Sequence, residues 1–433
     1  MKYFSTSNHS PKADFKEATL KGQAPDKGLY FPEKIPSLPE DFLKNITSFS
    51  NEEIAYKVIH PYIGETIPEN KLKHIISETI NFDFPLVKIE ENIYSLELYH
   101  GPTLAFKDVG ARFMSRCLEY FVKDGNKKVT VLVATSGDTG GAVASGFFNV
   151  EGIDVVILYP SGKVSSVQEL QLTTYGNNIT ALEINGNFDD CQSLVKKAFA
   201  DTELNEQLFL TSANSINVAR WLPQQFYYFF AYRQWQNKST PPVFSVPSGN
   251  FGNICAGLLA HRSGLPVSHF IAACNANKIF PEFMKTGDYI PAKAVATISN
   301  AMDVGDPSNF VRILELFNKE FPSLKEILTS CSISDNTTAE TIKEVYNGNR
   351  YLLDPHGAVA YAGLKQYLFN HPSDKGIVLE TAHPVKFYDV VEPIINQKVP
   401  IPNTVKALLG KEKTSIRMDP DYNTLKDYLL MKG

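Results

Sequence analysis

The sequence has no long hydrophobic run, no signal-peptide pattern and no excess of basic charge. None of its apolar runs approaches the ~18 residues of a membrane span, and the most apolar stretch, Phe226–Tyr232, is far shorter. The N-terminal residues Met1–His9 lack the apolar core of a secretion signal. The net charge of −5 comes from well-mixed charges, which disfavours nucleic acid and anionic membranes as partners. We therefore expect a cytoplasmic, soluble protein.

Cysteine and histidine are scarce and scattered. The five cysteines form no CxxC pair and mostly lie among apolar residues, which is typical of buried thiols in a reducing compartment. The nine histidines include no HExxH spacing, so no metal site built from protein ligands is expected. The 433 residues, 43% of them hydrophobic and 21% charged, suit a globular chain of two or three domains.

Buried-strand patterns alternate with helical patterns along most of the chain. Strands are predicted at Ile93–Tyr99, Val129–Ala134, Val155–Pro160, Thr180–Ile184, Val243–Val246, Val267–Cys274 and Gly376–Glu380. Apolar strands that alternate with helices predict parallel sheets covered on both faces. We expect an N-terminal domain over residues 1–92, a first α/β domain over 93–237 and a second over 238–433.

Several other elements can be predicted from local pattern. One helix is expected from about Ser215 to Gln236, and a helix pair over Phe310–Phe321 and Leu324–Ser330. His356 and His383 are expected at strand-to-loop corners, as hydrogen-bonded structural residues rather than bases.

Two glycine-rich loops follow predicted strands in successive halves of the chain. Each has the order strand, Ser-Gly-(Asp or Asn)-x-Gly, apolar helix, within Thr135–Gly141 and Pro247–Asn253. Such a turn presents backbone N–H groups at a helix N-terminus and can bind an anion. Two of them suggest two anions held at the carboxyl ends of strands. Neither fits GxGxxG and no GxxxxGK[ST] occurs, so a dinucleotide or ATP is disfavoured. The alternative is two tight turns that need glycine only for backbone reasons.

One lysine stands apart from the other basic residues. Lys107 follows the Gly101-Pro102 turn and the apolar Leu104–Phe106, and it precedes an amphipathic run from Val109 to Phe121. Desolvation favours the neutral amine, which can form a Schiff base of the kind that anchors pyridoxal phosphate. The alternative is a lysine at a helix start whose ammonium reaches water. The lysine together with both loops favours a phosphate-bearing ligand.

These motifs together resemble the threonine synthases, a family of fold-type II pyridoxal-phosphate enzymes related to the tryptophan synthase β subunit. The matching segments cover nearly the whole chain: Leu20–Leu29, His100–Asp108, Thr135–Gly140, Gly162–Ser165, Asn214–Asn217 with Arg220, Pro247–Asn253, Asn300–Asp303 and Glu380–Pro384. The resemblance implies an α/β fold with two three-layer αβα parallel-sheet domains and a small N-terminal domain. It also implies pyridoxal 5'-phosphate as cofactor.

The resemblance assigns a role to each motif. Lys107 would carry the Schiff base and then move protons, and Thr381 would face the pyridine nitrogen. The cofactor phosphate would rest on Gly249, Asn250, Phe251, Gly252 and Asn253. The substrate carboxylate would be held by Ser136, Gly137, Asp138 and Thr139. The substrate phosphate would be held by Lys163, Ser215, Asn217 and Arg220. Many relatives have an asparagine at the position of Asp138, in contact with the ring hydroxyl.

The implied reaction is a β,γ-replacement that converts O-phospho-L-homoserine and water to L-threonine and phosphate, the last step of threonine biosynthesis. The protein would be a monomer or homodimer. Three alternatives stay open: another pyridoxal-phosphate lyase such as a threonine or serine dehydratase, a nucleotide-dependent α/β enzyme, and a non-catalytic relative that binds a metabolite.

Overall fold

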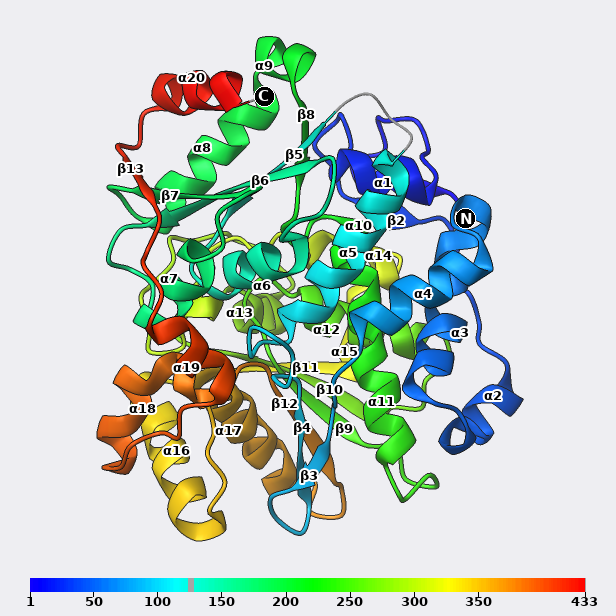
Figure 1. Ribbon diagram of the computed structural model, residues 1–433. Coiled ribbons are helices and arrows are strands. Elements are labelled where there is room, and N and C mark those ends of the chain that lie inside the picture. The colour runs from blue at the N-terminus through cyan, green and yellow to red at the C-terminus, as the bar shows by residue number, and fades with distance from the viewer. Residues whose placement is uncertain (124–127, 433) are drawn as a thin grey trace. The chain divides into compact units, whose positions relative to one another are not determined.

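The computed structural model describes residues 1–123 and 128–432, which form two compact units (Figure 1). Unit 1 consists of Met1, Phe31–Phe106 and Trp221–Pro400. Unit 2 consists of Lys2–Tyr30, Lys107–Arg220 and Ile401–Gly433. Each unit is assembled from separate stretches, so its boundaries differ from the three consecutive segments expected from the sequence.

Unit 1 contains a six-stranded sheet. Its order is β11 (Leu328–Ser332), β10 (His269–Cys274), β9 (Val243–Pro247), β12 (Gly376–Glu380), β4 (Ile93–Glu97) and β3 (Leu86–Lys88). All neighbours are parallel except β3, which runs antiparallel to β4. Every residue of β9, β10 and β12 is buried, as expected for strands covered on both faces. The one hydroxyl in β9, Ser245, is satisfied by donating to the Ala360 carbonyl oxygen at 2.7 Å.

The helices of unit 1 include several that the sequence analysis did not predict, such as α17 (Pro355–Asn370). The helices of this unit are α2 (Glu40–Lys44), α3 (Asn51–Ile63), α4 (Glu69–Thr79), α11 (Phe226–Gln234), α12 (Gly252–Arg262), α13 (Ile279–Thr286), α14 (Phe310–Leu316), α15 (Phe321–Ile327), α16 (Asp335–Asn349), α17 and α18 (Tyr388–Ile395).

Unit 2 contains a five-stranded sheet in which all neighbours are parallel. Its order is β13 (Ile416–Met418), β7 (Ile179–Ile184), β6 (Ile153–Pro160), β5 (Val129–Ala134) and β8 (Phe209–Ser212). Its helices are α1 (Phe15–Lys21), α5 (Lys107–Val122), α6 (Asp138–Phe147), α7 (Ser166–Thr173), α8 (Phe188–Ala200), α9 (Thr202–Gln207), α19 (Asn403–Leu409) and α20 (Tyr422–Lys432). The α/β prediction with parallel sheets is confirmed.

Unit 2 includes residues from near both ends of the chain. Near the N-terminus, the Phe15 ring of α1 packs edge-on against Phe121 of α5, with ring centroids 6.1 Å apart. Near the C-terminus, β13 extends the sheet beside β7, and α20 lies beside α8 (Figure 1). Leu425 and Leu429 of α20 are buried in the same hydrophobic cluster as Leu194. These apolar contacts are long-range, which is why local pattern did not reveal the units.

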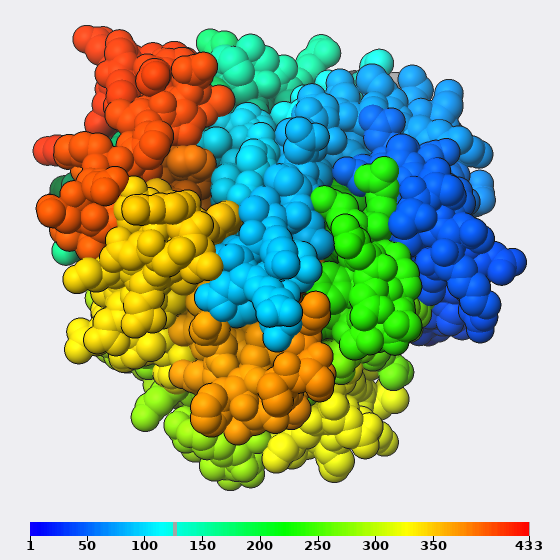
Figure 2. Space-filling view, turned by 90° about the horizontal axis from the view of Figure 1, so that it is seen from below, coloured from blue at the N-terminus to red at the C-terminus, as the bar shows by residue number. Residues whose placement is uncertain are grey.

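The amino ends of three neighbouring strands of unit 1 meet on the face shown in Figure 2. The Gly376 N–H donates to the Asn92 carbonyl oxygen at 2.9 Å, and the Val243 N–H donates to the Lys375 carbonyl oxygen at 3.0 Å. β4, β12 and β9 therefore begin side by side. Because the strands are parallel, their carboxyl ends share the opposite edge of the sheet.

Two predicted strands, β5 and β12, match the structure residue for residue. The helix expected over Ser215–Gln236 is instead broken into α10 (Val218–Trp221), a 3-10 turn (Leu222–Gln225) and α11. Pro223 lies in that turn and has no N–H to continue an α-helix. The helix expected over Leu324–Ser330 is correct only to Ile327, where α15 ends, because Leu328 begins β11, which pairs with β10.

His356 lies at the start of α17 and not at a strand-to-loop corner as expected. The ten residues of α17 from Pro355 to Leu364 are all buried, so this part of the helix has no polar face that would create a helical period. Elsewhere, every helix of the described residues is too short or too polar to cross a lipid bilayer.

Candidate active site

Unit 1 places three predicted motifs at one edge of its sheet. β9, β12 and β4 are adjacent and parallel, so the segments that follow them leave the same edge. After β9 comes the Gly249–Asn253 loop, and after β12 comes Thr381. After β4 comes the segment that leads to Lys107. In α/β proteins this is the edge at which ligands bind.

The backbone that leads to Lys107 is bonded to the residues around Thr381. The Phe106 N–H donates to the Thr381 carbonyl oxygen at 2.9 Å, and the His383 N–H donates to the Leu104 carbonyl oxygen at 3.0 Å. Ala105 and Ala382 form an antiparallel bridge between these bonds. These bonds fix, within unit 1, the segment that ends directly before Lys107.

The loop after β9 has the geometry of an anion-binding turn. Phe251 adopts a left-handed backbone conformation with φ 61° and precedes α12. The Cys255 N–H makes the first helical bond, to the Phe251 carbonyl oxygen at 3.0 Å, so the amides before it have no acceptor within the helix. Gly249 permits the loop to pack closely, because a Cβ there would lie 2.6 Å from the Met302 Cα.

Asn253, in the first turn of α12, adds a side-chain donor. It is 6% exposed, and its Oδ1 accepts a hydrogen bond from the Tyr228 hydroxyl at 3.0 Å. Burial raises the pKa of Tyr228 well above its ordinary value, so its hydroxyl stays protonated and donates. Within the described residues, the buried Asn253 Nδ2 has no hydrogen-bond partner. A buried amide donor without an acceptor is costly unless a ligand supplies one.

Asn250 is held by the N-terminal end of α14. Its Oδ1 accepts hydrogen bonds from the Ser308 hydroxyl at 2.9 Å and from the Ser308 N–H at 3.2 Å. The Asn309 side chain donates to the Asn250 carbonyl oxygen at 3.1 Å. The loop is therefore fixed from outside before any ligand binds.

Unit 2 places Lys107 next to a buried carboxylate. Lys107 is the first residue of α5 and its side chain is 17% exposed. Its Nζ lies 3.7 Å from Asp138 Oδ2, and Asp138 is 4% exposed. The other carboxylate oxygen, Oδ1, accepts a hydrogen bond from Gln168 Nε2 at 2.9 Å. The structure thus brings the predicted catalytic lysine and the predicted Ser-Gly-Asp-Thr loop together.

The Ser136–Thr139 loop leads directly into α6. Thr135 Oγ1 accepts hydrogen bonds from the Gly137 N–H at 3.0 Å and from the Gly140 N–H at 2.9 Å. Gly137 has φ 134°, in the region that favours glycine. The helix starts at Asp138, so its first turn can bind a carboxylate through backbone amides.

The four residues predicted to bind the substrate phosphate differ in their surroundings. Lys163 is exposed in the turn after β6, and Ser215 is half-buried after β8. Asn217 is fully buried and bonded within unit 2: its amide donates to the carbonyl oxygens of Thr19 at 2.9 Å and Ser212 at 3.1 Å. The Asn217 Oδ1 accepts a hydrogen bond from the Ala219 N–H at 3.0 Å, so the side chain is bonded to the backbone at three residues.

Arg220 is also buried, and it donates to the Ala213 carbonyl oxygen. It lies against α5 at Gly110, where a Cβ would come within 2.7 Å of the Arg220 carbonyl oxygen. Because β8, β5 and β6 are adjacent, the segments with Ser215, Ser136 and Lys163 leave the same edge of the unit 2 sheet.

A buried network of Glu380, Asp354 and His356 supports the unit 1 edge; the sequence predicted His356 as a hydrogen-bonded structural residue but not its partners. Glu380 Oε1 accepts the Asp354 N–H at 2.6 Å, and burial together with Asp354 raises the pKa of Glu380 well above its ordinary value. His356 is bonded through Nδ1 to Asp354 Oδ1 at 2.5 Å. Its Nε2 accepts the Ala301 N–H at 3.2 Å, so the proton is on Nδ1. Ala301 precedes Met302, the residue packed on Gly249.

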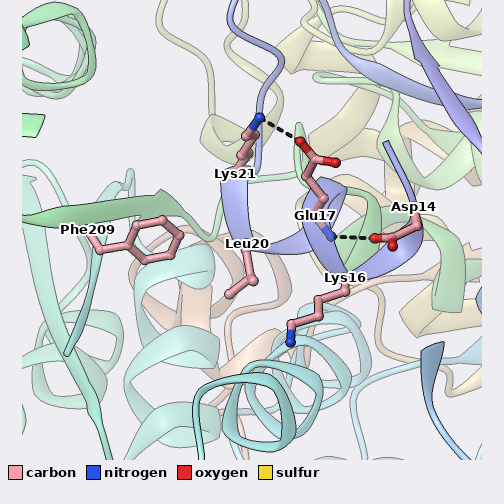
Figure 3. A pocket seen from close by; sticks show the side chains of 6 residues that line it. All are labelled: Asp14, Lys16, Glu17, Leu20, Lys21 and Phe209. Atoms are coloured by element: carbon pink, nitrogen blue, oxygen red, sulfur yellow. Dashed lines mark hydrogen bonds and ion pairs between the residues drawn. The ribbon is translucent and has the colours of Figure 1, made fainter. Parts of the chain in front are cut away.

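A surface pocket of about 250 Å³ lies in unit 2, away from these motifs (Figure 3). It is lined by Asp14, Lys16, Glu17, Leu20, Lys21 and Phe209. Phe209 pairs with Val129 at the amino end of β5, whereas the Thr135–Thr139 loop follows its carboxyl end. The pocket therefore lies at the other edge of the sheet.

Comparison with known proteins decides the family. The family described as pyridoxal-phosphate dependent enzyme matches residues 82–380, and those described as threonine synthase N terminus and threonine synthase, C-terminal match residues 2–80 and 357–429. The threonine synthase of Haemophilus influenzae is 44% identical over 431 residues, which is 99% of this chain and 100% of that protein. The chain belongs to the threonine synthase family.

Solved structures agree with this assignment. The crystal structure of threonine synthase from Escherichia coli covers 100% of both chains with a TM-score of 0.94 and 40% identity. A structure described as pyridoxal-phosphate-bound threonine synthase from Brucella melitensis covers 100% of this chain and 99% of that chain, with a TM-score of 0.93 and 34% identity. The family and fold expected from the sequence motifs are confirmed, as is pyridoxal phosphate as the cofactor.

The residues present fit this cofactor. The orphaned Asn253 Nδ2 and the first-turn amides of α12 suit its phosphate. The Lys107 amine, partly accessible at the start of α5, suits its aldehyde. Thr381 is buried next to the backbone that leads into Lys107. Gln168, Tyr228 and His356 were not predicted as parts of the site; of these only Gln168 has a local signal, the Ser-x-x-Gln capping box that opens α7.

Proposed function

We propose that the protein converts O-phospho-L-homoserine and water into L-threonine and inorganic phosphate. The observation that carries this proposal is the match to proteins named threonine synthase over 99% of this chain, at 44% identity for the protein of Haemophilus influenzae and 41% for that of Escherichia coli. The donor chemistry of the two loops supports it, because each helix N-terminus suits one anionic group.

Lys107 is the central residue of the proposed mechanism. Bound pyridoxal phosphate supplies an electron sink conjugated with the substrate Cα, which makes the Cα and Cβ protons removable. The Lys107 amine holds the cofactor until the substrate amine displaces it. It then takes protons from Cα and Cβ and returns protons to Cγ and Cα. Phosphate leaves with the electron pair of the Cγ–O bond. Water forms the new Cβ–O bond as one of its O–H bonds breaks, and the released proton leaves on the phosphate.

The two anion-binding loops position the reacting carbons. Ser136, Gly137, Asp138 and Thr139 would bind the substrate α-carboxylate, and Gly249–Asn253 with Thr381 would hold the cofactor. Lys163, Ser215 and Arg220 remain the proposed donors for the substrate phosphate, whereas Asn217 is better suited to hold the backbone that carries them. Holding a substrate by both ends lowers the barrier by fixing its orientation.

Phosphate release from O-phospho-L-homoserine, with threonine identified as product, tests the proposal. We expect turnover by the cofactor-loaded protein, loss of at least ~10³-fold in kcat for Lys107→Ala, and no comparable deamination of threonine or serine. Preferred turnover of threonine or serine would favour a dehydratase instead. Cofactor binding without any turnover would indicate a non-catalytic relative.

We also propose a cytoplasmic location and a monomeric or homodimeric state. All five cysteines, which lie in the described residues, are free thiols, as suits a reducing compartment. Sedimentation of the purified chain tests the oligomeric state, and larger assemblies would contradict it.

A further inference from the structure

Gln168 is the residue of unit 2 that connects two of the proposed substrate-binding segments. It lies in α7 and is 1% exposed. Its Nε2 donates to Asp138 Oδ1 at 2.9 Å, and its Oε1 accepts the Ser165 N–H at 3.2 Å. Asp138 belongs to the proposed carboxylate loop, and Ser165 ends the turn that carries Lys163.

The orientation of the Gln168 amide is fixed by both partners. A carboxylate requires a donor and a backbone N–H requires an acceptor, so the nitrogen faces Asp138 and the oxygen faces Ser165. Ser165 Oγ in turn accepts the Gln168 N–H at 3.3 Å, which completes a reciprocal capping box at the start of α7. A side chain held at both amide atoms cannot rotate away from Asp138 without breaking its half of this cap.

The loop is shaped to admit this amide. A Cβ on Gly137 would lie 2.5 Å from Gln168 Cδ, closer than any side chain could be accommodated. Gly137 also has φ 134°, which side chains rarely adopt. The glycine of the Ser-Gly-Asp-Thr motif therefore serves a second purpose besides exposing backbone amides, because it lets Gln168 reach the neighbouring carboxylate.

We propose that Gln168 is a positioning residue: it holds the Asp138 carboxylate against the Lys107 amine, and it links Asp138 to the turn that carries Lys163. This inference rests on the proposed function. Asp138 uses Oδ1 for Gln168 and Oδ2 for Lys107. The Lys107 amine gains and loses a proton during the proposed reaction, whereas the Gln168 amide stays neutral throughout. Gln168 thus keeps the buried carboxylate aligned in every protonation state of the lysine.

The test uses two substitutions of Gln168 and one matched control. Gln168→Met keeps the length of the side chain but removes the donor. Gln168→Glu keeps the acceptor for Ser165 and can donate to Asp138 only when protonated. Gln171→Met is the control, because Gln171 is also a buried glutamine of α7. It lies against Gly141, where an added Cβ would be 3.2 Å from the Gln171 Cβ.

Steady-state kinetics with O-phospho-L-homoserine gives the first readout. We expect Gln168→Met to lower kcat by roughly 10- to 100-fold at all pH values, the effect of one hydrogen bond to a charged group. We expect Gln168→Glu to approach the wild type at low pH and to lose activity as pH rises and the new carboxyl ionises. Gln171→Met should stay within about twofold of the wild type. A purely structural role would not produce the pH-dependent recovery.

A second readout needs neither cofactor nor turnover. Acetylation of Lys107 by acetic anhydride in the full-length apoprotein, followed against pH by peptide mass spectrometry, reports how strongly Asp138 stabilises the ammonium. We expect the labelling midpoint to fall to lower pH in Gln168→Met and to stay at the wild-type value in Gln171→Met. Thermal melts confirm folding, and Gln168→Glu keeps the test valid if Gln168→Met does not fold.

The outcomes separate this inference from the proposed function. If both Gln168 variants match Gln171→Met in kcat and in labelling midpoint, Gln168 is not a positioning residue. If the wild type releases no phosphate from O-phospho-L-homoserine, the proposed function fails. The labelling experiment then still decides whether Gln168 holds Asp138 against Lys107.

Discussion

Replacing Asn253 by leucine should have opposite effects on the apoprotein and on cofactor binding. Asn253 Nδ2 is buried and has no partner in the described part of the chain. Leucine has a similar shape and removes this unsatisfied donor, which costs about 1–3 kcal/mol when buried. Tyr228 keeps a second acceptor, the Asn253 carbonyl oxygen at 3.0 Å. We therefore expect the apoprotein variant to unfold in urea with unchanged or greater free energy.

Cofactor affinity should change in the other direction. A hydrogen bond from a neutral amide to a phosphate contributes about 1.5–3 kcal/mol, so the Kd for pyridoxal phosphate should rise about 10- to 150-fold, at ~1.4 kcal/mol per tenfold change. Fluorescence titration of the apoprotein measures it. Pyridoxal, which lacks the phosphate, is the matched control and should bind the two proteins with similar affinity. An unchanged Kd for pyridoxal phosphate, or an equal loss for pyridoxal, would refute the assignment of Asn253 to the phosphate.

Three further substitutions test other parts of the structure. Burial raises the pKa of Glu380, so the folded protein favours the protonated carboxyl, and the free energy of unfolding falls as rising pH ionises it. Glu380→Gln cannot ionise. The variant should therefore unfold at a higher urea concentration than the wild type at pH 9 and at a similar concentration at pH 5. Gly249→Ala places a Cβ 2.6 Å from the Met302 Cα and should destabilise the fold by about 1–3 kcal/mol. Lys413→Met removes the ion pair between the Lys413 amine and the buried Glu183 carboxylate, 2.8 Å apart. The free energy of unfolding should fall by about 2 kcal/mol, less than for a fully buried pair because the lysine is partly exposed.

The glycine substitution has a matched control, and the lysine substitution has a pH test. Gly410→Ala is the control for Gly249→Ala: Gly410 has an ordinary backbone conformation, with φ −96°, and a Cβ there would meet no atom within 4 Å, so the free energy of unfolding should change by less than ~0.5 kcal/mol. The pKa of Glu183 is held at about 2 despite its burial, because Lys413, Ser161 and Ser415 donate to it. The stability this gives is present above the ordinary Glu pKa and is lost as pH falls toward 2, so the cost of Lys413→Met should shrink on acidification. A pH-independent cost would contradict that account.

The sequence predicted best those elements that short-range pattern determines. The strands β5 and β12 are continuous apolar runs bounded by polar or glycine residues, so their ends could be located. Each glycine loop follows such a strand directly, and each leads into a helix as expected. Lys107 was identified because it is isolated among small and apolar neighbours.

Other features depend on contacts that no local pattern records. Helix α17 was missed because its first ten residues are all buried and give no helical period. The assignment of residues 2–30 and 401–432 to unit 2 depends on contacts such as Phe15 with Phe121 and Leu425 in the core beside α8. The bond between Gln168 and Asp138 spans 30 positions, and that between Tyr228 and Asn253 spans 25. Such pairs can be found only once the three-dimensional arrangement of the strands and of the helices between them is known.

The most direct test of the account is to locate the covalent attachment of the cofactor. The protein is loaded with pyridoxal phosphate, reduced with borohydride, digested and mapped by mass spectrometry. The account predicts a single pyridoxyl group on Lys107, and none in the Lys107→Ala variant. Modification of a different lysine, or no modification of the loaded protein, would contradict it.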